Sequence, residues 1–140
     1  ERPEHSPHYE YHKFDPSDPK TYRRSVYRFM VRSQPDPYMT TLDCADSSQS
    51  TPQRTETLTP LQALTMLNHP WTMVAAEQWS ERLKGDFTNV SDAMRSAFFE
   101  LTGRVMTEDE EIALLEFADR HGLANACRIL FNLSEFVYVD

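Results

Sequence analysis

Proline and glycine divide this chain into two parts that must fold by different rules. All nine prolines lie at or before Pro70, and all three glycines lie at or after Gly85. Proline lacks the backbone N–H that helices and central strands need, so the first part is expected to be extended and rich in turns. The second part has no proline after Pro70, and its backbone is free to form uninterrupted helices.

Charge is divided in the same way, and it limits the partners. Residues 1–58 hold eight basic and nine acidic side chains, whereas residues 59–140 hold six and thirteen. The net charge of −8 repels phosphate backbones, so nucleic acid is not an expected partner. No apolar run approaches the roughly 20 residues needed to cross a bilayer, so no membrane insertion is expected. The chain starts at Glu1 without a leader, and we interpret it as a segment of a longer protein.

Apolar spacing and capping residues predict five helices in the second part. Thr59 and Pro60 start the first helix, Ser91 caps the third, and a capping box at Thr107 opens the fourth. The three glycines are each expected just past the end of a helix. The apolar positions at helical spacing are Leu61, Leu64, Leu67, Trp71, Val74, Ala75, Trp79, Leu83, Met94, Ala97, Phe98, Leu101, Ile112, Leu115, Ala118, Ala126, Ile129, Leu130 and Leu133.

The first part has weaker local signals. Residues 1–20 are expected to form an extended linker or strap. Residues 21–32 fit either a helical face or an alternating strand, and their aromatic and β-branched content favours an extended segment. Residues 33–58 show no sustained period and are expected to be irregular. The predicted fold is therefore mainly α, a single domain over residues 21–140 in which about five short helices form a compact bundle, with room for one or two short strands near the start. The last residues, from Phe136, are expected to be extended.

Four separated motifs carry a family resemblance. They are RRSVYRF, the pattern P-x-x-Y-M-x-T-x-D, the run RTETLTPLQALTMLN over residues 54–68, and the ending ILFNLSEFVYVD. Together, over about residues 20–140, they resemble the planctomycete-type C-terminal domain of unknown function called planctomycete-specific domain one. The resemblance implies the C-terminal part of a large exported protein, periplasmic or on the cell surface. Its implied partners are the other domains of the same polypeptide, often including a cytochrome-c-like domain.

The cysteines allow two interpretations. Cys44 and Cys127 belong to no C-x-x-C-H motif, so no c-type haem, and no other cofactor, is expected on this segment. A disulfide between them is compatible with an exported protein, and two ordinary buried thiols are the alternative. The resemblance argues against a bridge shared by the whole family, because relatives often carry another residue at the position of Cys44.

Basic side chains suggest one candidate binding site. Arg23, Arg24, Arg28 and Arg32 have no acidic residue among them. Arginine forks bind sulfate, phosphate or carboxylate bidentately, so an acidic or sulfated glycan is a candidate partner. Pairing within the chain, with Asp43 and Asp46, is the other interpretation.

The run from Arg54 to Asn68 places hydroxyl and amide groups at a helix start. Such a start can bind an anion through its free N–H groups, or threonines can simply cap it. Gln62 and Asn68, if buried, would need partners and could hold the loop in place. In the binding hypothesis a cleft is lined by Arg23, Arg24, Asp43, Asp46, Arg54, Thr57, Gln62 and Asn68.

Catalytic and metal signals are weak, and the sequence does not decide whether the chain is an enzyme. It contains no nucleophile elbow, zinc-protease motif or glycine-rich phosphate loop. His8 and His12 have helical spacing, but Pro3 and Pro7 disfavour a helix there, so no metal site is predicted. Two hypotheses result: a non-catalytic interaction or structural domain, and a domain that handles carbohydrates or anions, with part of a hydrolase site in the Arg-rich loop as one form of the second.

Overall fold

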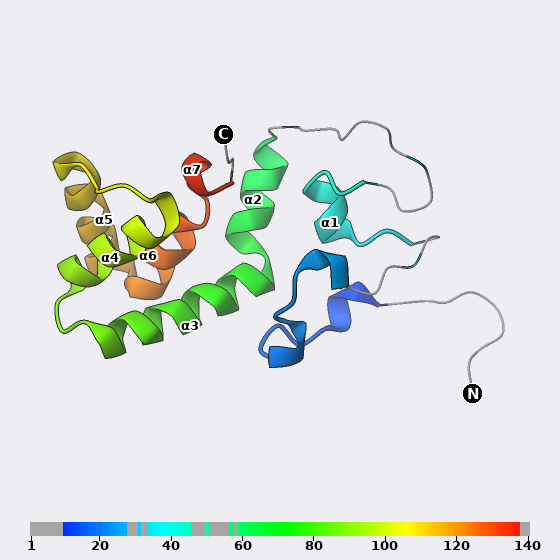
Figure 1. The fold of residues 1–140 in the computed structure, drawn as a ribbon, viewed down its shortest axis with the longest axis horizontal. Coiled ribbons are helices and arrows are strands. Elements are labelled where there is room, and N and C mark those ends of the chain that lie inside the picture. The colour runs from blue at the N-terminus through cyan, green and yellow to red at the C-terminus, as the bar shows by residue number, and fades with distance from the viewer. Residues whose placement is uncertain are drawn as a thin grey trace. The chain divides into compact units, whose positions relative to one another are not determined.

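The computed structural model describes residues 10–27, 31, 34–45, 50, 57 and 59–137. The described residues contain seven α-helices and no strand, which confirms the predicted mainly α fold (Figure 1). The chain divides into two compact units, Glu1–Thr65 and Met66–Asp140, and the division falls within one helix.

The first unit begins with three short 3-10 turns, η1 at Tyr11–Lys13, η2 at Pro19–Thr21 and η3 at Ser25–Tyr27. An isolated antiparallel bridge joins Val31 and Gln34. The extended structure favoured for residues 21–32 is therefore wrong for η3. Hydrogen bonds within the turns, such as the one from Tyr27 N–H to Arg24 C=O at 2.9 Å, satisfy the backbone N–H and C=O groups locally. Residues 28–30 and 32–33 lie outside the described residues.

A short helix, α1, spans Pro37–Thr41 within the segment predicted to be irregular. Asp36 caps it by accepting the backbone N–H of Tyr38 at 3.0 Å, and proline occupies the first helical position. These are standard start signals that sequence analysis overlooked, because a helix this short shows no apolar period. Asp36 is only 5% exposed, so the carboxylate that starts α1 is also buried.

Helices α2 (Pro60–Asn68) and α3 (Pro70–Asp86) are separated by His69. The His69 Nδ1 accepts the backbone N–H of Trp71 at 3.3 Å and so caps α3. Gly85 lies within the last turn of α3, not beyond it as predicted, and Phe87 is the C-terminal cap. Continuation of the helix through this glycine costs little, because only the final turn is affected.

Four helices complete the second unit: α4 (Val90–Thr102), α5 (Glu108–His121), α6 (Leu123–Leu130) and α7 (Ser134–Val137). Asn89, and not Ser91, caps α4. The predicted capping box at Thr107 is confirmed, as is Gly103, whose φ of 74° closes α4 in the left-handed region. Phe136 lies in α7, so the extended ending predicted from this residue is wrong up to Val137.

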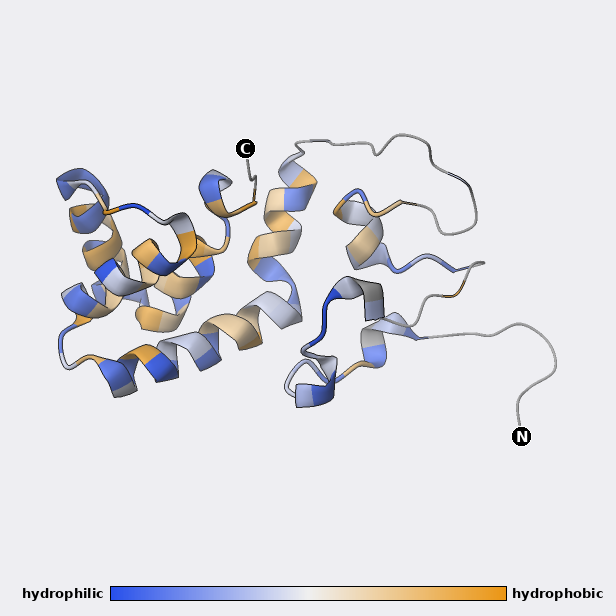
Figure 2. Cartoon of the chain, in the orientation of Figure 1, coloured by the Kyte–Doolittle hydropathy of each residue, from blue (hydrophilic) through white to orange (hydrophobic). Residues whose placement is uncertain are grey.

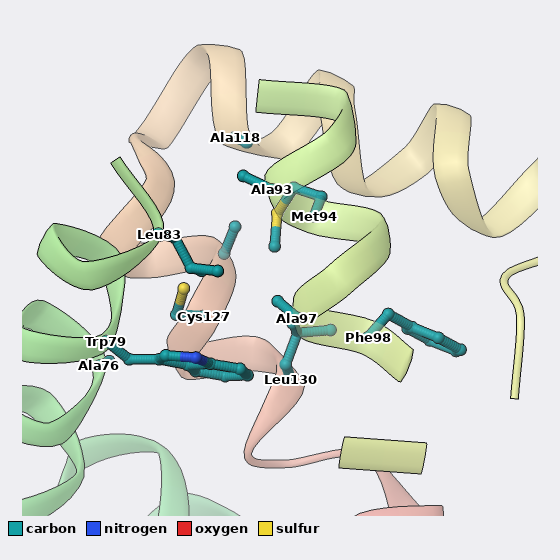
Figure 3. Close-up of a cluster of buried hydrophobic side chains, with 11 residues drawn as sticks. Ala76, Trp79, Leu83, Ala93, Met94, Ala97, Phe98, Ala118, Cys127 and Leu130 are labelled. Carbon is teal, nitrogen blue, oxygen red and sulfur yellow. The ribbon is translucent and has the colours of Figure 1, made fainter. Parts of the chain in front are cut away.

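The core of the second unit lies where α3, α4, α5 and α6 meet (Figure 3). Apolar colouring gathers on these helices, whereas the segment 10–27 is mainly hydrophilic (Figure 2). Ile112 was predicted to face inward but is 64% exposed. It precedes Ala118 by six residues, which places it about 120° around α5 from that buried alanine. The buried apolar residues are Ala76, Trp79, Leu83, Ala93, Met94, Ala97, Phe98, Ala118, Ala126, Cys127 and Leu130.

None of the described helices combines the length and the apolar character that a membrane span requires.

Candidate functional site

Asp43 occupies an unusual backbone position at the end of α1. The Cys44 N–H bonds to the Met39 carbonyl at 3.0 Å, and the Asp43 N–H bonds to the Thr40 carbonyl at 3.2 Å. These two bonds form a Schellman ending, in which the residue after the cap adopts positive φ and is usually glycine. Here Asp43 adopts it, with φ of 56°. A carboxylate therefore stands where the backbone alone would favour glycine.

Gln62 lies at the start of α2, in a capping box that the sequence analysis did not identify. The Thr59 backbone N–H donates to Gln62 Oε1 at 2.9 Å, and the Gln62 backbone N–H donates to Thr59 Oγ1 at 3.3 Å. The spacing Thr-x-x-Gln is the signal that could have revealed it. Gln62 is 7% exposed, so its amide needs partners within the protein.

Asp43, Thr57 and Gln62 bind one another, and we call this group the Asp43 clamp. The Gln62 Nε2 donates to Asp43 Oδ2 and to Thr57 Oγ1, both at 2.9 Å. Thr57 donates its backbone N–H to Asp43 Oδ2 at 2.6 Å and its hydroxyl to the same oxygen at 2.7 Å. The clamp thus connects the end of α1, one point of the intervening segment and the start of α2.

The clamp, as far as the structure describes it, does not include Arg23, Arg24 or Asn68. Arg23 and Arg24 are exposed. Asn68 is the last residue of α2 and belongs to the second unit. Asp46 and Arg54 lie outside the described residues. Of the six predicted site residues that the structure describes, three come together: Asp43, Thr57 and Gln62.

A second charged group, which the sequence analysis missed, is centred on Arg104. Its guanidinium makes two bonds to Glu110, at 2.8 and 2.7 Å, and two to Glu135, at 2.9 and 3.0 Å. It also lies 4.7 Å from the centre of the Phe98 ring. We call these four residues the Arg104 hub. No local signal pairs Arg104 with Glu135, because the two are far apart in the chain.

The Arg104 hub strongly lowers the pKa of Glu110. Hydrogen bonds from Arg104, and then from the backbone N–H of Thr107, lower the pKa of Glu110 to about 2. Glu110 also belongs to the capping box of α5. The ion pairs of the hub therefore fix the α4–α5 connection, the start of α5 and α7.

Both cysteines carry free thiols. Burial raises the pKa of the Cys127 thiol to about 11, which makes it a poor nucleophile at neutral pH. Cys127 belongs to the core, in agreement with the interpretation as an ordinary buried thiol.

The described histidines have structural contacts. The His121 ring packs on Phe117, with 4.4 Å between ring centres, and His69 caps α3. Among the described residues, no three His, Cys, Asp or Glu side chains are grouped so that they could hold a metal ion. His5, His8 and the side chain of His12 lie outside the described part of the chain.

Comparison with known proteins gives a family but no characterised relative. A family model described as PSD1, protein of unknown function (DUF1553), matches residues 2–118. No curated protein matches the chain. No solved structure matches it either.

Proposed function

We propose that this chain, which belongs to the PSD1 family of proteins of unknown function (DUF1553), is a non-catalytic interaction domain of a large exported multidomain protein. The family that the four sequence motifs indicated is confirmed by the match. The partners proposed for the domain are the other domains of the same polypeptide.

The Asp43 clamp is the observation that carries this proposal. A binding or catalytic cleft would direct Asp43, Thr57 and Gln62 toward a ligand. Instead, the hydroxyl of Thr57 and the side-chain N–H groups of Gln62 are donated within the clamp. Hydrogen bonds of this kind hold the end of α1 and the start of α2 together. They also occupy the donors of Thr57 and Gln62 that would otherwise bind a ligand.

The arrangement of the clamp also explains why a carboxylate is tolerated at positive φ. Left-handed backbone is costly for residues other than glycine, although aspartate and asparagine adopt it more readily than most. Strain of this kind persists where surrounding contacts support it. At Asp43 the supporting contacts are internal, which favours a structural role for this residue.

Two measurements together test the proposal. In the first, thermal denaturation of the chain is followed with sulfate, phosphate, heparin, polygalacturonate, Ca²⁺ and Zn²⁺. A ligand specific for the folded state raises the midpoint in a saturable manner. The same ligands are tested on the variant Asp43→Asn. We expect no ligand to raise the midpoint of the wild type in a way that this variant loses. A saturable shift that this variant abolishes while remaining folded would replace the proposal with a ligand site.

In the second measurement, the chain is mixed with the other segments of its parent polypeptide and examined by sedimentation velocity. We expect a complex with at least one segment. If every segment sediments independently of the chain, the interaction function is wrong.

An acidic glycan is a second candidate partner, and one specific observation favours it. Arg23 and Arg24 are exposed between two tyrosines, of which Tyr22 is 45% and Tyr27 72% exposed. Arginine forks suit sulfate or carboxylate groups, and aromatic faces offer stacking surface. Retention on immobilised heparin that a double variant, R23A with R24A, abolishes would support this candidate. Equal retention of wild type and variant would exclude this surface.

A further inference from the structure

The short helix α7 covers an aromatic stack on the second unit. The rings of Trp79 and Phe131 are stacked with centres 5.1 Å apart, and the Phe136 ring lies 5.6 Å from Phe131. Trp79 is 9% exposed, whereas α7 itself contains no buried residue. Phe136 is therefore the outer member of a stack whose inner member belongs to the core.

The charged contact of α7 lies beside this stack. Arg104 Nε and Nη2 donate to the two carboxylate oxygens of Glu135 at 2.9 and 3.0 Å. This is a bidentate arginine–carboxylate pair, which is more specific in geometry than a single ion pair. Glu135 and Phe136 are adjacent in the chain, so α7 is attached by two neighbouring side chains of different chemistry.

The surface that receives α7 is held in place by residues outside α7. Arg104 is fixed on its other side by Glu110, at 2.8 and 2.7 Å, and lies over the Phe98 ring. Phe131 is stacked on Trp79. These contacts do not require Glu135 or Phe136, so the receiving surface is expected to persist when α7 moves away.

Attachment of α7 is correspondingly weak. The pair between Arg104 and Glu135 is exposed, with side chains 39% and 45% accessible. Exposed ion pairs contribute little to stability, and segments with few buried contacts open locally before the protein unfolds. We therefore expect α7 to detach at a lower free-energy cost than the unfolding of α3 to α6.

We propose that the surface formed by Arg104 and Phe131 is a docking site for a helical turn carrying an acidic residue next to an aromatic one, which the chain's own Glu135 and Phe136 occupy here. This inference rests on the proposed interaction function and names the class of partner, a protein segment of that chemistry. The native occupant itself defines the chemistry: a carboxylate for the arginine fork and a ring for Phe131.

Competition with the tethered α7 sets a threshold for any partner. A tethered segment acts at an effective concentration that is commonly in the millimolar range for a short connection. The site is thus closed to weak binders and open to a segment that docks more tightly, or to one that arrives when α7 has been released.

The first test measures release of α7 by amide hydrogen exchange in the whole chain. Glu135→Gln removes the charge of the pair, and we expect exchange at residues 134–137 to accelerate by about two- to fivefold, as for loss of an exposed ion pair, while core amides in α4 and α6 are unchanged. Glu116→Gln is the matched control, because Glu116 pairs with Arg120 on the surface of α5 alone. Unchanged exchange in α7 would show that the pair between Arg104 and Glu135 does not hold α7 on this surface, and would overturn the proposed docking site.

The second test measures docking in trans. A capped peptide with the sequence of residues 132–137, NLSEFV, is added at millimolar concentration to a chain carrying both E135Q and F136A. We expect saturable shifts of the amide resonances of Arg104 and Phe131, and none with the control peptide NLSQAV. Absence of these shifts, or equal shifts with both peptides, would overturn the docking site.

The outcomes separate this inference from the proposed function. Peptide docking without association with any segment of the parent polypeptide would keep the site and reject those partners. Association with a segment that is undiminished in Arg104→Met would keep the interaction function and reject this site as its surface.

Discussion

The two units of this chain are stabilised by different forces. The buried side chains described in the first unit are two apolar residues, Tyr11 and Val31, and two polar ones, Asp36 and Gln62. In the second unit, the buried residues are dominated by an apolar cluster contributed by α3, α4, α5 and α6. The described part of the first unit is therefore organised by hydrogen bonds at helix ends, and the second unit by burial of apolar surface.

The polar residues of the first unit show how such a region is specified. Tyr11 accepts the Val31 N–H through its hydroxyl at 3.0 Å, Asp36 caps α1, and Gln62 joins the clamp. Each bond adds little net stability, but a buried group left without its partner is costly. The stability of the first unit should thus depend on the chemical identity of a few polar atoms, whereas the stability of the second should depend on side-chain volume.

The largest expected effect concerns volume in the second unit. Phe98→Ala removes a ring that is 1% exposed, and it should destabilise the bundle by about 3–5 kcal/mol. Phe99→Ala, one residue later on the same helix, is the matched control because Phe99 is 55% exposed. Urea unfolding followed by circular dichroism measures both. Similar losses for the two variants would contradict the assignment of this helix face to the core.

The next effect concerns polar identity in the first unit. Asp43→Gly relieves the positive φ but removes the acceptor of Thr57 and Gln62. We expect a net loss of about 1–3 kcal/mol, because the amide of buried Gln62 loses a partner. Hydrogen exchange at residues 59–63 and urea unfolding measure it. A variant as stable as wild type would show that only backbone conformation matters at this position.

Acid should lower the stability of the second unit through protonation of Glu110. Its folded pKa is about 2, below the ordinary value of 4.5. A lowered carboxylate pKa means that its stabilisation is complete above pH 4.5 and is lost as pH falls toward 2. We expect the urea midpoint of the wild type to fall in this range more steeply than that of Glu110→Gln. If the urea midpoints of the wild type and of Glu110→Gln fall in parallel with pH, Glu110 does not stabilise the protein through the Arg104 hub.

The smallest expected effects concern two glycines of the second unit. Gly85 lies in the last turn of α3 with open space around it, so Gly85→Ala should stabilise by about 0.4–1 kcal/mol. Gly103 has φ of 74°, and Gly103→Ala should destabilise by roughly 1 kcal/mol. Thermal midpoints measure both changes. Equal signs for the two substitutions would show that local backbone conformation does not decide the outcome.

Much of the second unit follows from local signals in the sequence. The capping box at Thr107, the positive-φ cap at Gly103 and the apolar spacing of α4 each involve groups within a few residues of one another. Short-range signals can be read without the fold. The start of α1 at Asp36 and Pro37 and the capping box between Thr59 and Gln62 are local signals of the same kind, although α1 is too short to show an apolar period.

Contacts between distant residues were decided only by the tertiary structure. The sequence identified Asp43, Thr57 and Gln62 as candidates, but it did not determine that they bind one another. It gave no reason to pair Arg104 with Glu135, since the chain offers 22 acidic residues to 14 basic ones and spacing does not choose among them. Local hydrogen bonds set the helices, whereas the folded backbone brings carboxylate, amide and guanidinium groups within 3 Å of their partners, and only there do their roles become distinct.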